Sequence, residues 1–461
     1  MGENMIKNKI YKKLVILTAA LIFFSLVITP ALGTITTQSN EINEYEKIIC
    51  TQEKSNSEIP LPPPATTDMI LEESVFRRKS VRNFTEDPVS DEDLSTILWA
   101  AYGLRLDGSH TVPSIGGVHG SIIYVLKEDA AYTYNPENHS LVFYKDGDWR
   151  DVVGWQYYAP IQLAMCYDTD IIDRKLGGAE VGMIDQNIQF MTNALGLGTV
   201  VTAQTPPAID PLGIPENQEG FTVMPIGHPD YEPYNFVNRP LWISFLPKIQ
   251  MSDMTLSTAL DEREESTSFG GTISRNEMSQ MVWATSGFSP YRDKSGEPYH
   301  KGRHRTIPSG KGYYPVDIYV VKNFAIYQYE PNLLTKINNV PVDFIGFPIL
   351  TFLKPVKFGN HKTTIADACS EPNIEDAPIT ILFILDREKT RPPNAPDLSS
   401  DELLPTWFHD AGAGVHNLML EAASWGLKAN FYEIQDQQAI IDLLNLDEEN
   451  TIPIFAAPIG H

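Results

Sequence analysis

The chain repeats itself, and the constant register of the repeat limits the folds that it can adopt. Pro113-Ser114 recurs as Pro308-Ser309 at a shift of 195 residues (308 minus 113). The segment 180–197 recurs at 410–427 at a shift of 230 residues (410 minus 180). Pro-Ile-Gly-His stands at 225–228 and again at 458–461. Chance similarity between apolar segments would not keep register over separate blocks, so the sequence predicts two copies of one structural unit.

Length and composition favour two globular domains. The 461 residues exceed a single domain of roughly 100 to 200 residues. Hydrophobic residues make up 42% of the chain, which is enough to form cores. We therefore predict a polar, proline-rich linker at 34–67, a first domain at 68–250, and a second, diverged domain at 251–461.

Each half is predicted to combine strands with a capped helix and a longer helix. Ser90 and Ser274 each precede a polar helix start, where a serine side chain can cap the first turn. SIIYVL at 121–126 is typical of a strand, and MIDQNIQFMTNALG at 183–196 has apolar residues at helical spacing and stops at glycine. No G-x-G-x-x-G or Walker sequence follows a strand, so an α+β fold is favoured over a Rossmann or P-loop fold.

The charge and the cysteine and histidine positions exclude several classes of function. A formal net charge of -24 argues against a nucleic-acid partner, because phosphate binding requires clustered Lys and Arg. Cys50, Cys166 and Cys369 have no C-x-x-C spacing, and we predict that they are free. His228 and His461 each follow a glycine and are typical of turn residues, so we predict no metal site.

The N-terminus indicates export. Lysines at 7, 9, 12 and 13 precede an uncharged run, 14–33, within a segment 1–33 that has the pattern of a signal peptide or a membrane anchor. The run is long enough to span a bilayer, and small residues near Ala31 also offer a cleavage site, so both outcomes stay open. Lysines on the leading side predict an extracytoplasmic location for the rest, whether secreted or anchored.

A cationic cluster stands out in this acidic chain. The segment 77–82 reads RRKSVR and contains four cations and a hydroxyl group. Arginine makes paired, charge-assisted hydrogen bonds to phosphate oxygens, and serine adds a neutral donor. The charges alone fit an anion-binding site and a solvated basic turn equally well.

Taken together, the order and spacing of the motifs resemble the nitroreductase family. The motifs are RRKSVRNFTEDPVSDEDLSTILWAAYG from 77, PSIGGVHGSIIYVL from 113, the E-x-G-x-x-x-Q-N helix at 180–187, and Gly-Leu-Gly at 196–198. The second motif is similar to the branch that contains the thiazoline and oxazoline dehydrogenases. The resemblance covers about 71–240 well and 263–461 more weakly. It implies two tandem nitroreductase-like domains, each a mixed or antiparallel sheet flanked by helices, that form an intramolecular pseudo-dimer in a monomeric chain.

The resemblance also implies an FMN site between the two copies, with each copy contributing different parts. The residues assigned to the cofactor are Arg78, Ser80, Arg82 and Arg239 for the phosphate, Ala203 and Gln204 for the reactive edge of the ring, and Pro308, Ser309 and Gly310 for the loop from the second copy.

The reciprocal site lacks this phosphate grip. At the positions of Arg78, Ser80 and Arg82, the second half has Arg263, Glu265 and Thr267. A carboxylate would repel a phosphate dianion at this position. We therefore predict one FMN per chain.

The predicted activity is that of an FMN-dependent oxidoreductase that reduces or dehydrogenates a small conjugated substrate. Its partners would be a small-molecule electron donor and acceptor, and no catalytic side chain is assigned because the flavin carries the redox step. Two alternatives stay open: a cofactor-free binding or structural protein that kept the fold, and a peptide azoline dehydrogenase. An insertion at 332–376 relative to the first half is expected to cover the flavin or to form a membrane-facing lip.

Overall fold

The structure is a computed structural model that describes residues 58–153, 157–202, 209–234, 236–238, 242–289, 291–293, 304–332 and 349–461. These residues lie within one compact unit, Ser55–His461. In this part of the chain, no helix is both long and apolar enough to cross a bilayer. The apolar run 14–33 lies outside the described residues, so anchoring and export remain predictions.

The first half forms a seven-stranded antiparallel sheet with the strand order β1-β4-β3-β2-β5-β7-β6. Its strands are β1 (Glu58–Pro60), β2 (Ser121–Leu126), β3 (Ala130–Asn135), β4 (Ser140–Asp146), β5 (Ile161–Asp168), β6 (Gly198–Thr199) and β7 (Gln218–Gly227). β5 is buried along nearly its whole length, because both faces of the sheet are covered there.

The second half repeats this order strand for strand, as β9-β13-β12-β11-β14-β17-β15. Its strands are β9 (Trp242–Ser244), β11 (Val316–Lys322), β12 (Ala325–Glu330), β13 (Ile349–Phe358), β14 (Ile379–Asp386), β15 (Lys428–Ala429) and β17 (Thr451–Gly460). β16 (Tyr432–Glu433) also pairs with β17. β9 pairs with β13 in parallel, whereas its counterpart β1 pairs with β4 antiparallel. The matching order confirms the predicted α+β fold with two tandem domains.

The helices obey the same repeat. The pairs are α3 (Leu71–Arg77) with α7 (Leu256–Glu262), α4 (Asp91–Tyr102) with α8 (Arg275–Ser286), and α6 (Arg174–Ala194) with α11 (Leu404–Ser424). Ser90 and Ser274 cap α4 and α8, as the sequence predicts, by accepting from the backbone N–H groups of Asp93 and Glu277. α6 and α11 keep the shift of 230 residues from end to end.

The remaining elements are shorter. They are α5 (Arg150–Val153), α10 (Lys362–Cys369), α12 (Gln437–Leu444), a ribbon of β8 (Phe236–Asn238) with β10 (Tyr291–Asp293), and the 3-10 turns η2 (Asp210–Leu212), η3 (Gly310–Gly312), η4 (Pro372–Glu375), η5 (Arg387–Thr390) and η6 (Asp401–Leu403). The β8–β10 ribbon joins segments from the two predicted domains, and β9, which precedes the predicted boundary at 250, belongs to the second sheet.

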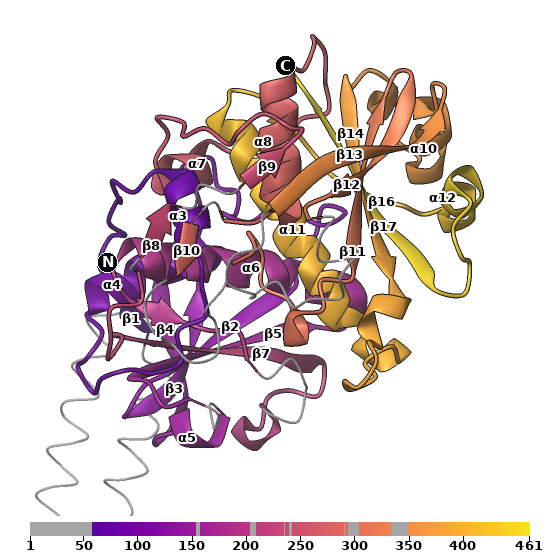
Figure 1. Ribbon diagram of the computed structural model, residues 1–461. Helices are drawn as coiled ribbons and strands as arrows, with labels where there is room; N and C mark the ends of the chain where they lie inside the picture. The colour runs from indigo at the N-terminus through magenta and orange to yellow at the C-terminus, as the bar shows by residue number, and fades with distance from the viewer. Residues whose placement is uncertain are drawn as a thin grey trace, which may run out of the picture. The chain divides into compact units, whose positions relative to one another are not determined.

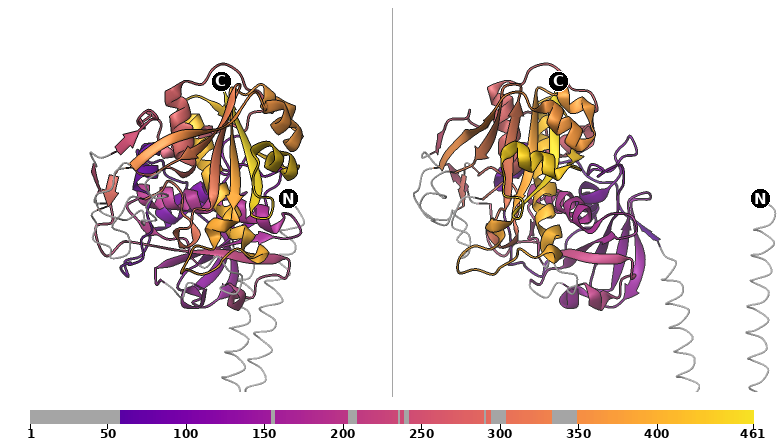
Figure 2. Two further views of the ribbon diagram at one scale, coloured as in Figure 1. Left: turned by 45° about the vertical axis from the view of Figure 1, so that its right-hand side comes forward. Right: turned by 90° about the vertical axis from the view of Figure 1, so that its right-hand side faces the viewer.

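Helices α6 and α11 cross between the two sheets (Figures 1 and 2). The crossing depends on a repeated glycine pair, because a methyl group on Gly182 would overlap the carbonyl oxygen of His409, and one on Gly412 would overlap that of Ala179. Glycine therefore allows the two backbones to touch. This contact holds the halves at a separation that no larger residue would permit.

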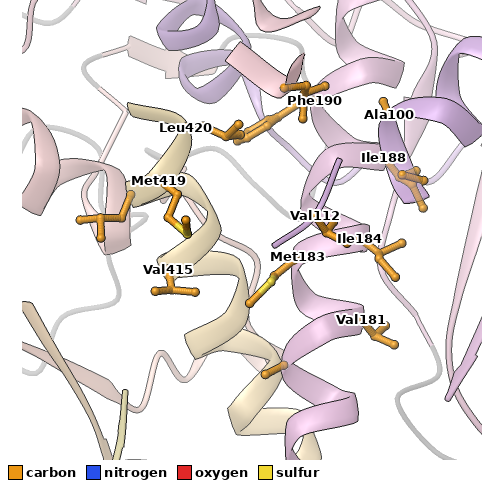
Figure 3. Close-up of a cluster of buried hydrophobic side chains, with 14 of the residues drawn as sticks. Ala100, Val112, Val181, Met183, Ile184, Ile188, Phe190, Val415, Met419 and Leu420 are labelled. Carbon is orange, nitrogen blue, oxygen red and sulfur yellow. The ribbon is translucent and has the colours of Figure 1, made fainter. Parts of the chain in front are cut away.

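Side chains on two faces of α6 join the cores of the halves. Met183 and Phe190 point toward α11, where Leu420 lies beside Phe190, while Ile184 and Ile188 point the other way (Figure 3). These residues belong to one buried cluster that includes strands of both sheets. Each fully buried apolar side chain of this size contributes about 1.5–3 kcal/mol. The halves therefore share one core.

Buried polar side chains at equivalent positions of α6 and α11 form equivalent hydrogen bonds in the two halves. The Asn187 side chain donates to the carbonyl oxygen of Ala100 at 2.8 Å, and its repeat counterpart Asn417 donates to that of Ala284 at 3.1 Å. His416 Nε2 lies 2.7 Å from Asn187 Oδ1. Such pairs offset the cost of burying polar atoms and fix the register of α6 on α11.

The described part of the 332–376 insertion is built into the second half. β13 occupies the place that β4 has in the first sheet, and α10 packs with α12 against a separate buried cluster on the outer face. Residues 333–348 lie outside the described residues, so a role in covering the flavin or contacting a membrane remains a prediction.

We predict that Gly412→Ala destabilises the protein by about 3 kcal/mol, because the added methyl group forces the two backbones apart. Chemical denaturation would measure the change. Glu92→Ala, at an exposed position of α4, is the control and should change stability by less than about 0.5 kcal/mol. A stabilising effect of Gly412→Ala, as is found for glycine in an exposed helix, would contradict the proposed close contact.

Candidate functional site

Arg78 connects the cationic cluster of the first half to the second half. It directly follows α3 and is 4% exposed. Its Nε donates to the carbonyl oxygen of Arg305 at 2.9 Å, and its Nη1 donates to Oε1 of Gln189 on α6 at 2.7 Å. Arg305 lies three residues before Pro308 (308 minus 305). The structure therefore brings the basic segment of one half beside the Pro-Ser loop of the other.

A second, half-buried arginine adds to the charge at this position. The guanidinium carbon of Arg305 lies 4.4 Å from the ring centre of Tyr314 and 4.7 Å from that of Phe288. Burial lowers the pKa of both Arg78 and Arg305, and the nearby Arg82 lowers that of Arg78 further. Positive charge that is partly shielded from water favours a bound anion. We call the group Arg78, Ser80, Arg82, Arg305 and 308–310 the first site.

Hydrogen bonds hold the loop of the first site in shape. Ser309 Oγ donates to Oδ2 of Asp410 on α11 and accepts from the backbone N–H of Tyr314 at 2.9 Å. Gly310 begins the turn η3, in which Lys311 and Gly312 have positive φ angles of 54° and 73°. The loop is therefore anchored to the same helix pair that joins the halves.

The other predicted site residues are placed as follows. Ser80 is half-buried in the extended segment between Arg78 and Arg82. Lys79 donates to the carbonyl oxygen of Pro233 at 3.1 Å, and Arg77 forms an ion pair with Glu73 at the surface. The predicted residues Ala203, Gln204 and Arg239 lie outside the described residues.

The reciprocal position, the second site, contains a carboxylate of the chain itself. Arg263 follows α7 as Arg78 follows α3, and its Nη2 donates to the carbonyl oxygen of His110 at 3.2 Å. Its Nη1 lies 3.1 Å from Glu265 Oε1, and Ser114 Oγ donates to Glu265 Oε2 at 3.1 Å. Arg263 and Ser114 are the repeat counterparts of Arg78 and Ser309. Glu265 thus bridges the two groups that correspond to the phosphate grip and the loop serine of the first site.

Imidazole groups replace the arginine and tyrosine of the first site. His110 and His119 occupy the repeat positions of Arg305 and Tyr314, and their ring centres lie 4.3 Å apart. His119 Nδ1 lies 3.0 Å from Oε1 of the buried Glu180, the counterpart of Asp410. Burial lowers the pKa of His110 and also lowers that of Arg263, to about 10. The second site therefore has less positive charge available to an external anion.

Sequence reasoning missed Arg305, Tyr314 and Gln189. The repeat gave a usable signal for the first two, because the shift of 195 residues aligns them with His110 and His119, which differ in chemistry. Nothing in the local sequence distinguishes Gln189 from other polar residues of α6. Its role depends on how the helix is oriented.

The cysteines and histidines that the sequence singled out do not form a metal site within the part of the chain that the structure describes. Among the described residues there is no group of three or more His, Cys, Asp or Glu side chains placed to hold an ion. Cys166 and Cys369 are buried and free, and Cys50 lies outside the described residues. His228 and His461 each have Nε2 at 3.2 Å from a backbone oxygen, those of Pro88 and Thr272, in equivalent turns.

The fold and the first site define a class of protein in which two copies of an α+β unit each contribute residues to a site between them. Comparison with known families gives that class a name. The model of the nitroreductase family matches residues 75–228 and 271–461, one region in each half. The chain belongs to the nitroreductase family, and its broad activity class is oxidoreductase.

The chain is also similar to individual proteins. A candidate nitroreductase of Methanocaldococcus jannaschii is 34% identical over 162 residues, which is 30% of this chain and 80% of that protein. The solved structure of a candidate nitroreductase from Anabaena variabilis covers 87% of this chain and 93% of its own, with a TM-score of 0.58 and 13% identity. It shows the same fold across both halves. Another, from Ralstonia eutropha, covers 44% of this chain and 95% of its own, with 26% identity and a TM-score of 0.36.

Because Glu265 neutralises the buried guanidinium of Arg263, we predict that Glu265→Ala lowers the free energy of unfolding by about 1–3 kcal/mol. Glu264→Ala removes the same charge from the exposed neighbouring position and should have little effect. Urea unfolding of both variants would compare them. Equal stability of the two variants would show that Glu265 does not act as an internal ligand of Arg263.

Proposed function

We propose that the chain is an FMN-dependent oxidoreductase that binds FMN at the first site, between its two halves, and reduces or dehydrogenates a small conjugated substrate. The observation that carries the proposal is the burial of Arg78 against the Arg305 carbonyl, which joins the basic segment of one half to the Pro-Ser loop of the other. Family membership supplies the expectation of a flavin, and this geometry supports its place.

The donor set at the first site fits an anionic, hydrogen-bonding cofactor. Arg305 Nε and Gln189 Nε2 are buried, and neither has a hydrogen-bond partner within the described structure. Buried donors of this kind cost free energy unless an acceptor satisfies them. Phosphate and ring carbonyl oxygens are acceptors, so the residues present fit FMN better than they fit an apolar ligand.

The side chains would bind and orient the cofactor. When bound, FMN would supply the two-electron redox chemistry by which a donor is oxidised and an acceptor is reduced. Arg78 and Arg82 would neutralise the phosphate, with Ser80 as a neutral donor. The Ser309 loop would set the depth at which a ring can enter. The shared core around α6 and α11 excludes water behind the site, which strengthens each of these charge interactions.

The extracytoplasmic location is a further part of the proposal. It is supported by the lysines and the apolar run at the N-terminus. The electron donor and acceptor would then be small molecules that are available outside the cytoplasm.

The first test is whether the purified protein binds FMN. We predict a yellow protein with flavin absorbance, loss of FMN in Arg82→Ala and Arg78→Ala, and weakened binding in Ser309→Ala. Losing one charge-assisted contact should weaken binding by about tenfold or more. Arg77→Ala, next in sequence but in a surface ion pair, is the matched control and should keep its colour.

Melting curves recorded alongside would separate loss of binding from loss of folding, since Arg78 is buried. A colourless wild-type protein that melts normally and takes up no added FMN would contradict the proposal. It would favour the alternative of a cofactor-free protein that kept the fold.

We also predict a stoichiometry of about one FMN per chain, because Glu265 already occupies the Arg263 and Ser114 contacts of the second site. The double variant Glu265→Ser with Thr267→Arg restores the Arg-x-Ser-x-Arg pattern of the first half. It should raise the ratio of flavin to protein above that of wild type in an absorbance titration. Two equivalents already bound by wild type would contradict this reading of the second site.

A further inference from the structure

A line of polar contacts connects the Ser309 loop to helix α6 of the opposite half. Ser309 Oγ donates to Asp410, and the preceding residue on α11 is His409. His409 Nε2 lies 3.0 Å from Oδ2 of Asp185 on α6, and the other carboxylate oxygen of Asp185 accepts from Thr222 Oγ1 at 3.2 Å. Asp185, His409 and Asp410 are at most 1% exposed. Three ionisable groups are therefore held together out of water where the halves meet.

His409 lies between two carboxylates. Its Nδ1 is 3.7 Å from Asp410 Oδ1, on the side away from Asp185. Burial opposes a charge on the imidazole, but the hydrogen bond with Asp185 and the attraction of both aspartates outweigh it and raise the pKa of His409 to about 9. The ring of Phe221 from β7 packs at 6.0 Å between ring centres and carries no charge. The same burial raises the pKa of Asp185 and of Asp410, and the attraction of His409 opposes that rise.

This arrangement occurs at only one of the two sites. By the shift of 230 residues, the counterparts of His409 and Asp185 are Ala179 and Val415, both apolar. Glu180, the counterpart of Asp410, is bound instead by the Gly120 N–H, the Ser121 hydroxyl and the imidazole of His119, which forms no ion pair with a second carboxylate among the described residues. A buried charged group is costly and is maintained only where its partners hold it well. Its presence beside the first site alone links it to the function of that site.

The contacts continue from Asp410 to the cationic cluster. Tyr314 donates its backbone N–H to Ser309 Oγ, and its ring lies against the Arg305 guanidinium. The Arg305 carbonyl accepts from Arg78. Displacing Asp410 would therefore loosen the whole segment from 305 to 314.

We propose that His409 is a positioning residue of the first site: it fixes the Asp410 carboxylate, which fixes the Ser309 loop against the basic segment of the first half. An ordered loop would strengthen the binding of FMN, and this part of the inference rests on the proposed function. The ordering of the loop does not depend on any ligand and can be tested in the free protein.

Hydrogen–deuterium exchange of the flavin-free full chain tests the ordering. His409→Asn and Asp410→Asn should each lower the protection of amides in 309–316, with the Tyr314 amide exchanging about tenfold faster or more. His416→Asn is the matched control, because His416 is also fully buried on α11 but bonds to Asn187 instead. Burial and Arg263 lower the pKa of His416, so this control removes a neutral imidazole.

Unchanged protection of 309–316 in both His409→Asn and Asp410→Asn would overturn the proposal. So would an equal loss in His416→Asn, which would indicate a general loosening of α11. If His409→Asn does not fold, Asp410→Asn breaks the same contacts from the other side and decides the outcome.

FMN affinity at two pH values gives a second readout. The free imidazole has a pKa of about 6.5, so the raised value means that the His409 contribution is complete below about pH 6.5 and is lost as pH rises through about 9. Wild type should bind FMN more weakly at about pH 9.5 than at pH 7, and His409→Asn should bind about tenfold more weakly at pH 7 with a flatter profile.

The two proposals fail in different ways. A wild-type protein that binds no FMN contradicts the proposed function, and the exchange experiment alone then decides the role of His409. Equal FMN affinity and equal pH profiles in wild type and His409→Asn overturn the positioning role while the proposed function stands.

Discussion

The backbone contact between helices α6 and α11 is the constraint on which the rest of the structure depends. Gly182 and Gly412 let the helices touch, and the side chains around them merge the cores of the two halves. Each helix then carries an anchor for one side of the first site, since Gln189 on α6 binds Arg78 and Asp410 on α11 binds Ser309. The site is therefore a consequence of the helix crossing, and neither half contains it alone.

Joining two copies in one chain has a physical consequence for their sites. In a symmetric homodimer any substitution appears at both sites, whereas in a tandem chain each site can change independently. The first site has Arg78 and Arg305 where the second has Arg263 and His110, and only the second contains a carboxylate, Glu265, between its arginine and its loop serine. The charge needed to hold an anion is thus concentrated on one side of the molecule.

The register of the repeat predicted the fold well, because two segments that repeat at a constant shift are expected to have the same order of strands and helices. The caps at Ser90 and Ser274 were predictable because a capping side chain bonds only within the first turn of its own helix, so the local sequence is enough to identify it. Contacts between distant segments were not predictable from local patterns. His409 and Asp185 lie 224 residues apart in sequence and meet only because of the angle at which α6 and α11 cross. The sequence suggested that Glu265 would repel phosphate, but only the folded structure shows that Arg263 and Ser114 already bind the Glu265 carboxylate.

We propose that cations of one half bind a phosphate group beside a loop of the other half. The most direct measurement compares the affinities of the protein for FMN and for riboflavin, which share the ring and differ by the phosphate. The account predicts that FMN binds at least about a hundredfold more tightly, since two charge-assisted contacts are lost with the phosphate, and that Arg82→Ala narrows the difference. Equal affinity for the two flavins, or a preference for FMN that Arg82→Ala leaves unchanged, would contradict it.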